Sequence, residues 1–551
     1  TPLPKTKYDE SKPENERPEW DNQYQFLMSC IATSVGLGNV WRFPFVAYQN
    51  GGGAFLIPYI IVLILIGKPM YYLETSLGQF SSSNCVKVWA LSPAMKGTGY
   101  AQALSALYVV SYYMSIVGLC LYYLVMSFQS TLPWALCQPE WENCVPSGQS
   151  VNLTEMTGEP SDGIDDGIGA PLWDLTLSLF VSWLIIFLIV ARGVKSSGKA
   201  AYFLALFPYV IMFILLIRAV TLPGAGMGIL FFITPEWEKI LQLRVWYAAV
   251  TQVFFSLSAC SGALIMFSSF NNFSQNVYRD SLIVTTLDTF TSLISGITIF
   301  GILGNLAYQL GYDNINDVIG SGGSSLAFIS YPDAIAQSPF VPQLFAALFF
   351  LMMAVLGFGS GVALLSTVNT IFLDAFPKVP TIYMSAITCS GCFLVGLVYV
   401  TPGGQYILEL VYWIISKRSR LTNYSISGLE NLCLDIEFML GLKSSFYWRI
   451  CWGIVTPFMM LVVFFYALVT TEQLLFGGTY EYPAGAYGTI ISLQTVRRSF
   501  RPKPTYGPRI AEKREEWHAF RRDAKYDREL KRRNWFQHIG YILVGGYRRG
   551  K

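Results

Sequence analysis

Long apolar stretches recur between residues 26 and 468 and are separated by short polar segments. A helix needs about 20 apolar residues to cross roughly 30 Å of hydrocarbon, and about ten stretches reach that length. This pattern predicts an all-α polytopic membrane protein. The predicted spans are approximately residues 26–48, 54–79, 100–128, 173–192, 200–221, 245–268, 282–307, 344–373, 381–400 and 448–469.

Two further apolar stretches are too short to cross a bilayer. Residues 406–415 would form only about 15 Å of helix, and they run directly into Lys417 and Arg418. Residues 484–496 end where a basic segment begins. We therefore predict two truncated spans near the end of the membrane region.

Composition supports a membrane location. The chain has 551 residues, of which 53% are hydrophobic and 13% charged, against about 25% charged in soluble domains. Soluble, disordered and collagen-like classes are thereby excluded. Residues 497–551 carry 17 Lys and Arg against 6 Asp and Glu, which places this tail in the cytoplasm by the positive-inside rule. Nucleic-acid binding is the less favoured interpretation of the tail.

One hydrophilic loop differs from the others in charge. Residues 137–174 contain eight Asp and Glu and no Lys or Arg, and they include Cys137, Cys144 and the sequon that begins at Asn152. We expect an extracellular loop with a disulfide and a glycan. The predicted organisation is a cytoplasmic segment 1–23, a transporter domain 24–470 with the extracellular loop 129–172, a truncated last-span region 471–496 and a basic cytoplasmic tail 497–551.

Two predicted spans contain residues that interrupt a helix. The first has Gly36, Gly38 and Pro44, and the sixth has a run of hydroxyl residues that ends at Gly262. Unwound backbone at membrane depth is tolerated only in a protein interior or beside a polar cavity. Interruptions at matching places in two halves are typical of secondary transporters built from repeats. The alternative is that the small residues only allow close helix packing.

Two charged residues inside the predicted spans also indicate a functional site within the membrane. Arg42 and Asp288 are candidates for an ion or substrate pathway. Lipid headgroups for Arg42, or a structural hydrogen bond for Asp288, remain alternatives. Both histidines, His518 and His538, lie in the basic tail, and the chain has neither a metal-ligand spacing of Cys and His nor a phosphate-binding loop. We therefore expect a protein that is not an enzyme and that draws its energy from an ion gradient.

Several motifs resemble a known family. GLGNVWRFP at 36–44, NGGGAF at 50–55 and FFSLS at 254–258 resemble the neurotransmitter:sodium symporter (solute carrier 6) family. Residues 192–209 and TPGG at 401–404 look most like its arthropod sodium-dependent nutrient amino acid transporters. The resemblance implies a LeuT-like five-plus-five inverted-repeat bundle, here with the tenth and twelfth family spans truncated.

The resemblance also implies ion sites. Asp288 stands where the family often has a neutral amide, so potassium could also be admitted, and Gly359 replaces a common side-chain ligand of the second sodium. The implied first sodium site is Ser34, Asn39, Ser256 and Asp288; the second is Ala32, Val35, Leu356 and Ser360; chloride would be held by Tyr59, Gln252, Ser256 and Ser292.

The implied substrate is an amino acid whose carboxylate lies near the first sodium, Gly36, Gly38 and the Tyr113 hydroxyl. Arg42 and Phe255 would form a gate; the acid that pairs with this arginine in the family is replaced by Tyr412. The implied substrate residues are Ser34, Gly36, Gly38, Val109, Tyr113, Phe255, Ser256, Ser258, Ser261 and Ser360.

The function expected from these features is uptake of neutral L-amino acids across the plasma membrane, coupled to sodium and assisted by chloride, through alternating access. The partners are then a small amino acid and the lipid bilayer, with no nucleic acid. The truncated spans favour one alternative, a transport-incompetent isoform that acts as a binding or regulatory protein. An amino-acid-sensing receptor is a second alternative.

Overall fold

The computed structural model describes residues 18–135, 168–311, 328, 331–336, 341–418, 429–469, 475–476, 480–481 and 513–520. Cys137, Cys144, Asn152 and residues 484–496 lie outside these ranges, so the disulfide, the glycan and the second truncated span stay predictions. The described elements are helices, apart from one short antiparallel pair formed by β1 (Leu475–Phe476) and β2 (Tyr480–Glu481). The all-α class is confirmed for this part of the chain.

Eight described helical segments are long and apolar enough to cross a membrane. They correspond to the predicted spans other than the first and the sixth, which are interrupted. The eight segments are Gly53–Ser81 (α3 Gly53–Val62, η2 Leu63–Gly67, α4 Lys68–Ser81), α5 (Lys96–Met126), α6 (Trp173–Val190), α7 (Val194–Thr221), Val277–Gln309 within α12 (Val277–Leu310), α14 (Pro342–Ala375), Thr381–Val400 (α15 Thr381–Gly396, η9 Leu397–Val400) and Phe446–Val463 (α18 Phe446–Ile450, η11 Cys451–Val455 and part of α19, Thr456–Val469).

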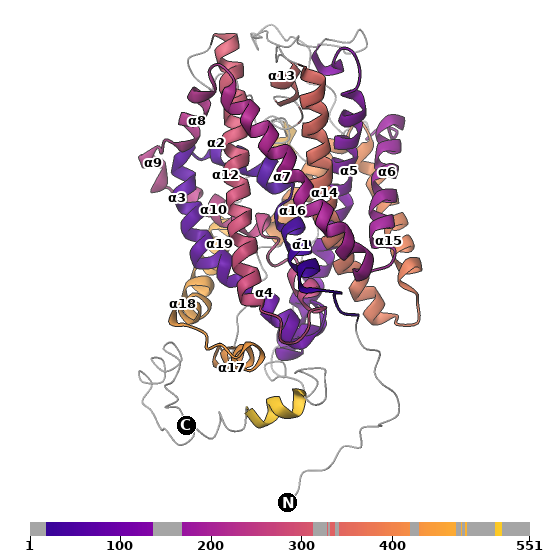
Figure 1. Cartoon of the computed structure of the whole chain (residues 1–551), viewed down its shortest axis with the longest axis vertical. Helices are drawn as coiled ribbons and strands as arrows, with labels where there is room; N and C mark the ends of the chain where they lie inside the picture. Colours follow the sequence, from indigo (N-terminus) through magenta and orange to yellow (C-terminus); the bar gives the residue numbers. More distant parts are fainter. Residues whose placement is uncertain are drawn as a thin grey trace, which may run out of the picture.

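The interrupted spans are α1 (Gln23–Ser34) with η1 (Gly38–Arg42) and α2 (Phe43–Gln49), and α10 (Leu243–Ser256) with α11 (Ala263–Ser268). Among the shorter elements, α8 and α13 lie toward the upper end of the bundle in Figure 1, and α17 lies at the lower end. The shorter elements are α8 (Ala225–Ile233), α9 (Trp237–Ile240), α13 (Tyr331–Ala336), α16 (Gly404–Arg418), α17 (Leu429–Leu440), η3 (Lys87–Leu91), η4 (Pro93–Met95) and η5 (Pro133–Ala135).

The helix α16 corresponds to the first stretch predicted to be truncated. It has 15 residues, or about 22 Å of helix at 1.5 Å per residue, which is less than the hydrocarbon thickness. Residues 419–428, which follow this helix, lie outside the described residues, so the truncation of this span stays a prediction.

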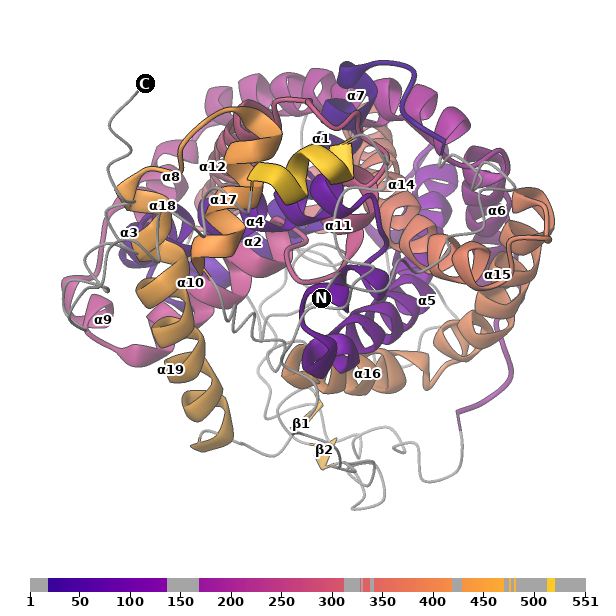
Figure 2. The same cartoon turned by 90° about the horizontal axis from the view of Figure 1, so that it is seen from below.

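Burial separates inner helices from outer ones. The apolar segment of α14 is 89% buried, whereas that of α6 is 28% buried. Viewed from below, α6, α7 and α15 lie at the rim, and α1 and α11 lie inside (Figure 2). The outer helices expose apolar side chains such as Leu188, Ile217 and Ile387, which suits contact with lipid tails.

One described helix of the basic tail, residues 513–520, packs against the lower end of the bundle (Figure 1). The buried Trp517 donates from Nε1 to Asp435 Oδ1 of α17 at 2.8 Å. Its ring lies 5.7 Å from that of Phe80 at the end of α4. Residues 513–520 thus contact the bundle through α17 and α4.

Candidate binding site

The first predicted span is interrupted in its middle. Helix α1 ends at Ser34, and the backbone resumes as the π-helical turn η1 at Gly38. The Gly36 amide donates to Asn39 Oδ1 at 3.3 Å instead of continuing the helix ladder. Pro44, at the start of α2, lacks an N–H group and favours irregular backbone before it. The predicted interruption is confirmed.

The sixth span is interrupted between α10 and α11. Ser258 and Cys260 have positive φ values of 51° and 62°, and Gly262 has a φ of 83°. Such backbone is strained for non-glycine residues and persists only where neighbours hold it. Here the buried Glu74 carboxylate accepts a hydrogen bond from the Cys260 amide at 2.9 Å. This second predicted interruption is also confirmed.

Asp288, in the middle of α12, connects the two interrupted spans. Its Oδ1 accepts hydrogen bonds from Asn39 Nδ2 at 2.7 Å and from Ser256 Oγ at 2.6 Å. Asn39 Nδ2 also donates to Ser292 Oγ at 3.0 Å. The carboxylate is fully buried, and its Oδ2 has no hydrogen-bond partner among the described residues. A buried carboxylate oxygen of this kind is an attractive ligand for a cation.

The residues expected at a first cation site are thus brought together. Asn39 and Ser256 each donate a hydrogen bond to Asp288, and Ser34 lines the same cavity as Asn39 and Ser256. Carboxylate, amide, hydroxyl and carbonyl oxygens are hard ligands that suit an alkali cation.

The residues expected at a second cation site lie where α1 meets α14. Ser360 Oγ donates to the Thr33 carbonyl at 3.2 Å. A Cβ added at Gly359 would overlap the Ala32 carbonyl oxygen, so glycine is required for this close approach of two helices. Val35 and Leu356 are both buried.

The residues expected to hold chloride gather around Asp288. Gln252 Nε2 donates to the Gly38 carbonyl at 3.2 Å. Ser256 and Ser292 belong to the hydrogen-bonded group of Asp288 and Asn39. The Tyr59 hydroxyl is buried without a hydrogen-bond partner in the described part of the chain. The chloride set and the first cation set therefore overlap. We call the hydrogen-bonded group of Asn39, Ser256, Asp288 and Ser292 the polar centre.

A cavity of about 170 Å³ lies beside this polar centre, and we call it the central cavity. All ten residues expected to bind substrate line it. Gly36 and Gly38 are needed for its shape, because a Cβ would overlap Ser360 Oγ at the first position and lie 2.9 Å from the Phe255 ring at the second. Arg42, one of the two expected gate residues, lies with its guanidinium 4.4 Å from the centre of the Phe255 ring.

Several residues of the central cavity were not predicted. Thr33 and Cys260 adjoin the two interruptions, so the glycines beside them were a usable signal. Met460 and Val463 lie in an apolar span whose sequence gave no sign of a cavity. The unpredicted residues are Thr33, Ser105, Tyr112, Val250, Thr251, Phe254, Ala259, Cys260, Leu364, Met460 and Val463.

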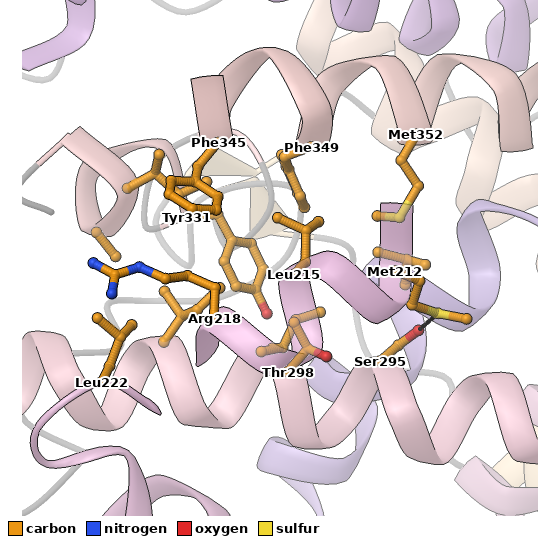
Figure 3. A pocket seen from close by; sticks show the side chains of 15 residues that line it. Met212, Leu215, Arg218, Leu222, Ser295, Thr298, Tyr331, Phe345, Phe349 and Met352 are labelled. Carbon is orange, nitrogen blue, oxygen red and sulfur yellow. Dashed lines mark hydrogen bonds between the residues drawn. The ribbon is translucent and has the colours of Figure 1, made fainter. Parts of the chain in front are cut away.

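A second cavity, of about 40 Å³, lies between α7, α12, α13 and α14 and on the other side of η1 (Figure 3). We call it the apolar cavity, because isoleucine, leucine, methionine, phenylalanine and other apolar side chains form most of its lining. Ser295 Oγ contacts Met212 Sδ at 3.4 Å, and the Arg218 guanidinium lies 5.5 Å from the centre of the Phe345 ring. Val40 of η1 completes the wall.

Comparisons with known proteins agree with the resemblance found in the motifs. The profile of the "Sodium:neurotransmitter symporter family" matches residues 17–503. The chain is 48% identical to sodium-dependent nutrient amino acid transporter 1 of Drosophila melanogaster, in an alignment that covers 94% of this chain and 91% of the relative. It is 49% identical to the protein of the same name in Drosophila virilis, with 97% and 94% covered.

The length of one alignment shows that the relative has additional residues. The alignment with the Drosophila melanogaster protein runs over 590 positions, which exceeds the 551 residues of this chain. The relative therefore has residues that have no counterpart here.

Proposed function

Because the chain belongs to the sodium:neurotransmitter symporter family, we propose that it couples sodium entry to the uptake of neutral L-amino acids across the plasma membrane. It is a multi-pass membrane transporter and not an enzyme. One observation carries the proposal: Asn39 and Ser256 line the central cavity and also bond to the buried Asp288 carboxylate. An ion at Asp288 and a substrate in the cavity would thus touch the same side chains.

Sodium is the ion that this centre suits. A buried carboxylate is stabilised by a cation that replaces its lost hydration, and Asp288 Oδ2 has no hydrogen-bond partner among the described residues. If the substrate carboxylate completes the shell of the same ion, each ligand raises the affinity for the other by the same factor. This shared ligation is the proposed basis of coupling.

The lining of the central cavity supports a neutral amino acid. Gly36 and Gly38 bring backbone to the cavity surface, and the Tyr113 hydroxyl lies close to Gly36, which gives polar groups for a carboxylate. Arg42 is the single charged side chain among the described lining residues, and it lies over Phe255, the other proposed gate residue. A positively charged substrate side chain would therefore find no acidic partner in this lining.

Alternating access would use the two interrupted helices. The breaks at residues 35–37 and 257–262 leave short half-helices that can tilt without disrupting a continuous ladder. Arg42 and Phe255 would close the outer side. We place this machinery in residues 24–470, with residues 1–23 and the basic tail 497–551 in the cytoplasm and residues 471–496 as the truncated last span.

Chloride would assist rather than be required. Tyr59, Gln252 and Ser292 offer donors, but the Asp288 carboxylate already supplies negative charge beside them.

The proposal also includes two covalent modifications in the loop 129–172. These are a disulfide between Cys137 and Cys144 and a glycan on Asn152.

The test is uptake of labelled neutral amino acids by cells that express this chain, with sodium, potassium or choline outside and surface expression measured in parallel. Sodium-driven accumulation is the expected result. Equal uptake in sodium and choline from a surface-expressed protein would contradict the proposal.

The rival proposal is a protein that binds but does not transport. It is favoured by the apolar stretches 406–415 and 484–496, each of which is too short to cross a bilayer. Sodium-dependent binding of an amino acid without accumulation would support this rival.

A further inference from the structure

The helix α19 forms part of the central cavity. Met460 and Val463 both line it, together with Val250 and Thr251 of α10. Both side chains of α19 are nearly buried, at 7% and 5% exposed. This wall is contributed by a helix that contains none of the residues expected at the ion or substrate sites.

The orientation of α19 is defined by its two faces. Positions 460 and 463 are three residues apart and share one face of the helix, which is the face toward the cavity. Phe458, Leu461 and Phe465 are 62%, 47% and 59% exposed and belong to the outward face. Only one face of α19 can therefore contact a substrate.

The position of α19 is fixed by its contact with α10. The Tyr466 ring lies 4.8 Å from the Tyr247 ring of α10. Because α10 also carries Val250, Phe254 and Phe255 of the cavity lining, the two helices form one largely apolar wall, in which Thr251 is polar. Ser256, the last residue of α10, donates to Asp288 and so lies at the polar end of this wall.

We propose that Met460 and Val463 determine the size of the amino acid side chain that the central cavity accepts. The inference rests on the proposed function, because it assumes that the carboxylate lies at the polar end and the side chain extends toward this apolar wall. The methionine is flexible and can adapt to different side chains. One methylene in such a pocket changes discrimination by about 10–200-fold, so a change of several atoms at residue 460 should be easily measured.

The test uses the full chain with the variants Met460→Ala and Met460→Trp. Sodium-dependent binding and uptake are measured for alanine, leucine, phenylalanine and tryptophan. Met460→Ala should raise the preference for tryptophan over alanine by about tenfold, and Met460→Trp should lower it by about tenfold. The matched controls Leu461→Ala and Leu461→Trp, on the outward face, should leave the preference within about twofold of the wild type.

A second measurement does not depend on transport. Met460→Cys should react with a charged, water-soluble sulfhydryl reagent at least tenfold faster than Leu461→Cys, after subtraction of the wild-type background. If the wild-type chain binds amino acids without accumulating them, the proposed transport fails while the size preference is still read from binding. Unchanged preference in both Met460 variants, or equal labelling of the two cysteines, overturns the inference.

Discussion

The central cavity and the apolar cavity lie on two sides of the same short helix. Gly38, Asn39 and Arg42 of η1 face the central cavity, whereas Val40 faces the apolar cavity. Both interrupted spans border the central cavity, whereas the apolar cavity is bordered mainly by α7, α12 and α14, with Val40 as its one residue from an interrupted span. The comparison teaches that two interrupted helices meeting beside hydrogen-bonded side chains, and not the presence of a space, distinguish a candidate transport site in this bundle.

The largest effect is expected for variants that remove the Asp288 carboxylate or the Asn39 side-chain amide. Asp288→Ala and Asn39→Ala should each abolish sodium-stimulated uptake, because removing one partner of a buried charge costs about 3–5 kcal/mol, or more than 100-fold. The first variant leaves the bound cation without its carboxylate, and the second leaves the carboxylate without the Asn39 hydrogen bond. The measurement is uptake against external sodium at matched surface expression. A wild-type sodium response in either variant would remove the proposed first sodium site.

The next largest effect on uptake is expected for a variant that adds a side chain where the first span is interrupted. Gly36→Ala should reduce uptake by about 10- to 100-fold, because overpacking costs about 1–3 kcal/mol and the new Cβ would overlap Ser360 Oγ. Ser360→Ala removes that atom together with a proposed ligand of the second sodium, so the double variant should lose less uptake than the two single losses combined, as read by initial uptake rates. Strictly additive effects of the two changes would show that the overlap is not the cause.

A smaller effect is expected at the proposed carboxylate position. Tyr113→Phe should raise the apparent KM for the amino acid by about tenfold, since a hydrogen bond to a charged group contributes about 1.5–3 kcal/mol. The maximal rate should change little, because the ring that packs in the wall is kept. Unchanged kinetics in a well-expressed variant would argue against contact between this hydroxyl and the substrate.

Chloride removal should have a still smaller effect. Replacing chloride by gluconate should lower wild-type uptake by roughly two- to threefold only, because a chloride beside the fixed Asp288 carboxylate is repelled by on the order of 1 kcal/mol or more. In Asp288→Asn, which keeps an oxygen ligand but not the charge, the dependence on chloride should become much stronger. Equal chloride dependence in the two proteins would separate Asp288 from the anion site.

The smallest effect is expected in the apolar cavity. Ser295→Ala should leave uptake within about twofold of the wild type, since the hydroxyl makes only a weak contact with Met212 Sδ. This variant is the natural control for the Asn39 and Asp288 variants. A large loss of sodium-dependent uptake would break the distinction between the two cavities.

The same comparison shows what the sequence could predict. Gly36, Gly38, Pro44 and Gly262 interrupt apolar patterns, so both breaks were predictable, and Asp288 was visible as a charge within a span. The motifs then identified substrate residues that the structure brings together around one cavity.

The remaining cavity residues left no comparable signal. Met460, Val463 and most of the residues that line the apolar cavity are ordinary hydrophobic residues in helices. An apolar side chain has the same pattern whether it faces lipid, a neighbouring helix or a cavity. Only the arrangement of helices in space separates Met460 from Phe458, which is 62% exposed.

The hydrogen bond between Asn39 and Asp288 joins residues 249 positions apart. During synthesis the first broken helix must therefore enter the membrane long before α12 supplies the carboxylate that its amide contacts. Unwound backbone in lipid needs polar partners, so the early segment depends on water or on the insertion machinery until α12 arrives. The transport site is thus also a late step of assembly, and ribosomal products that stop before α12 should be the ones recognised as unfinished and degraded.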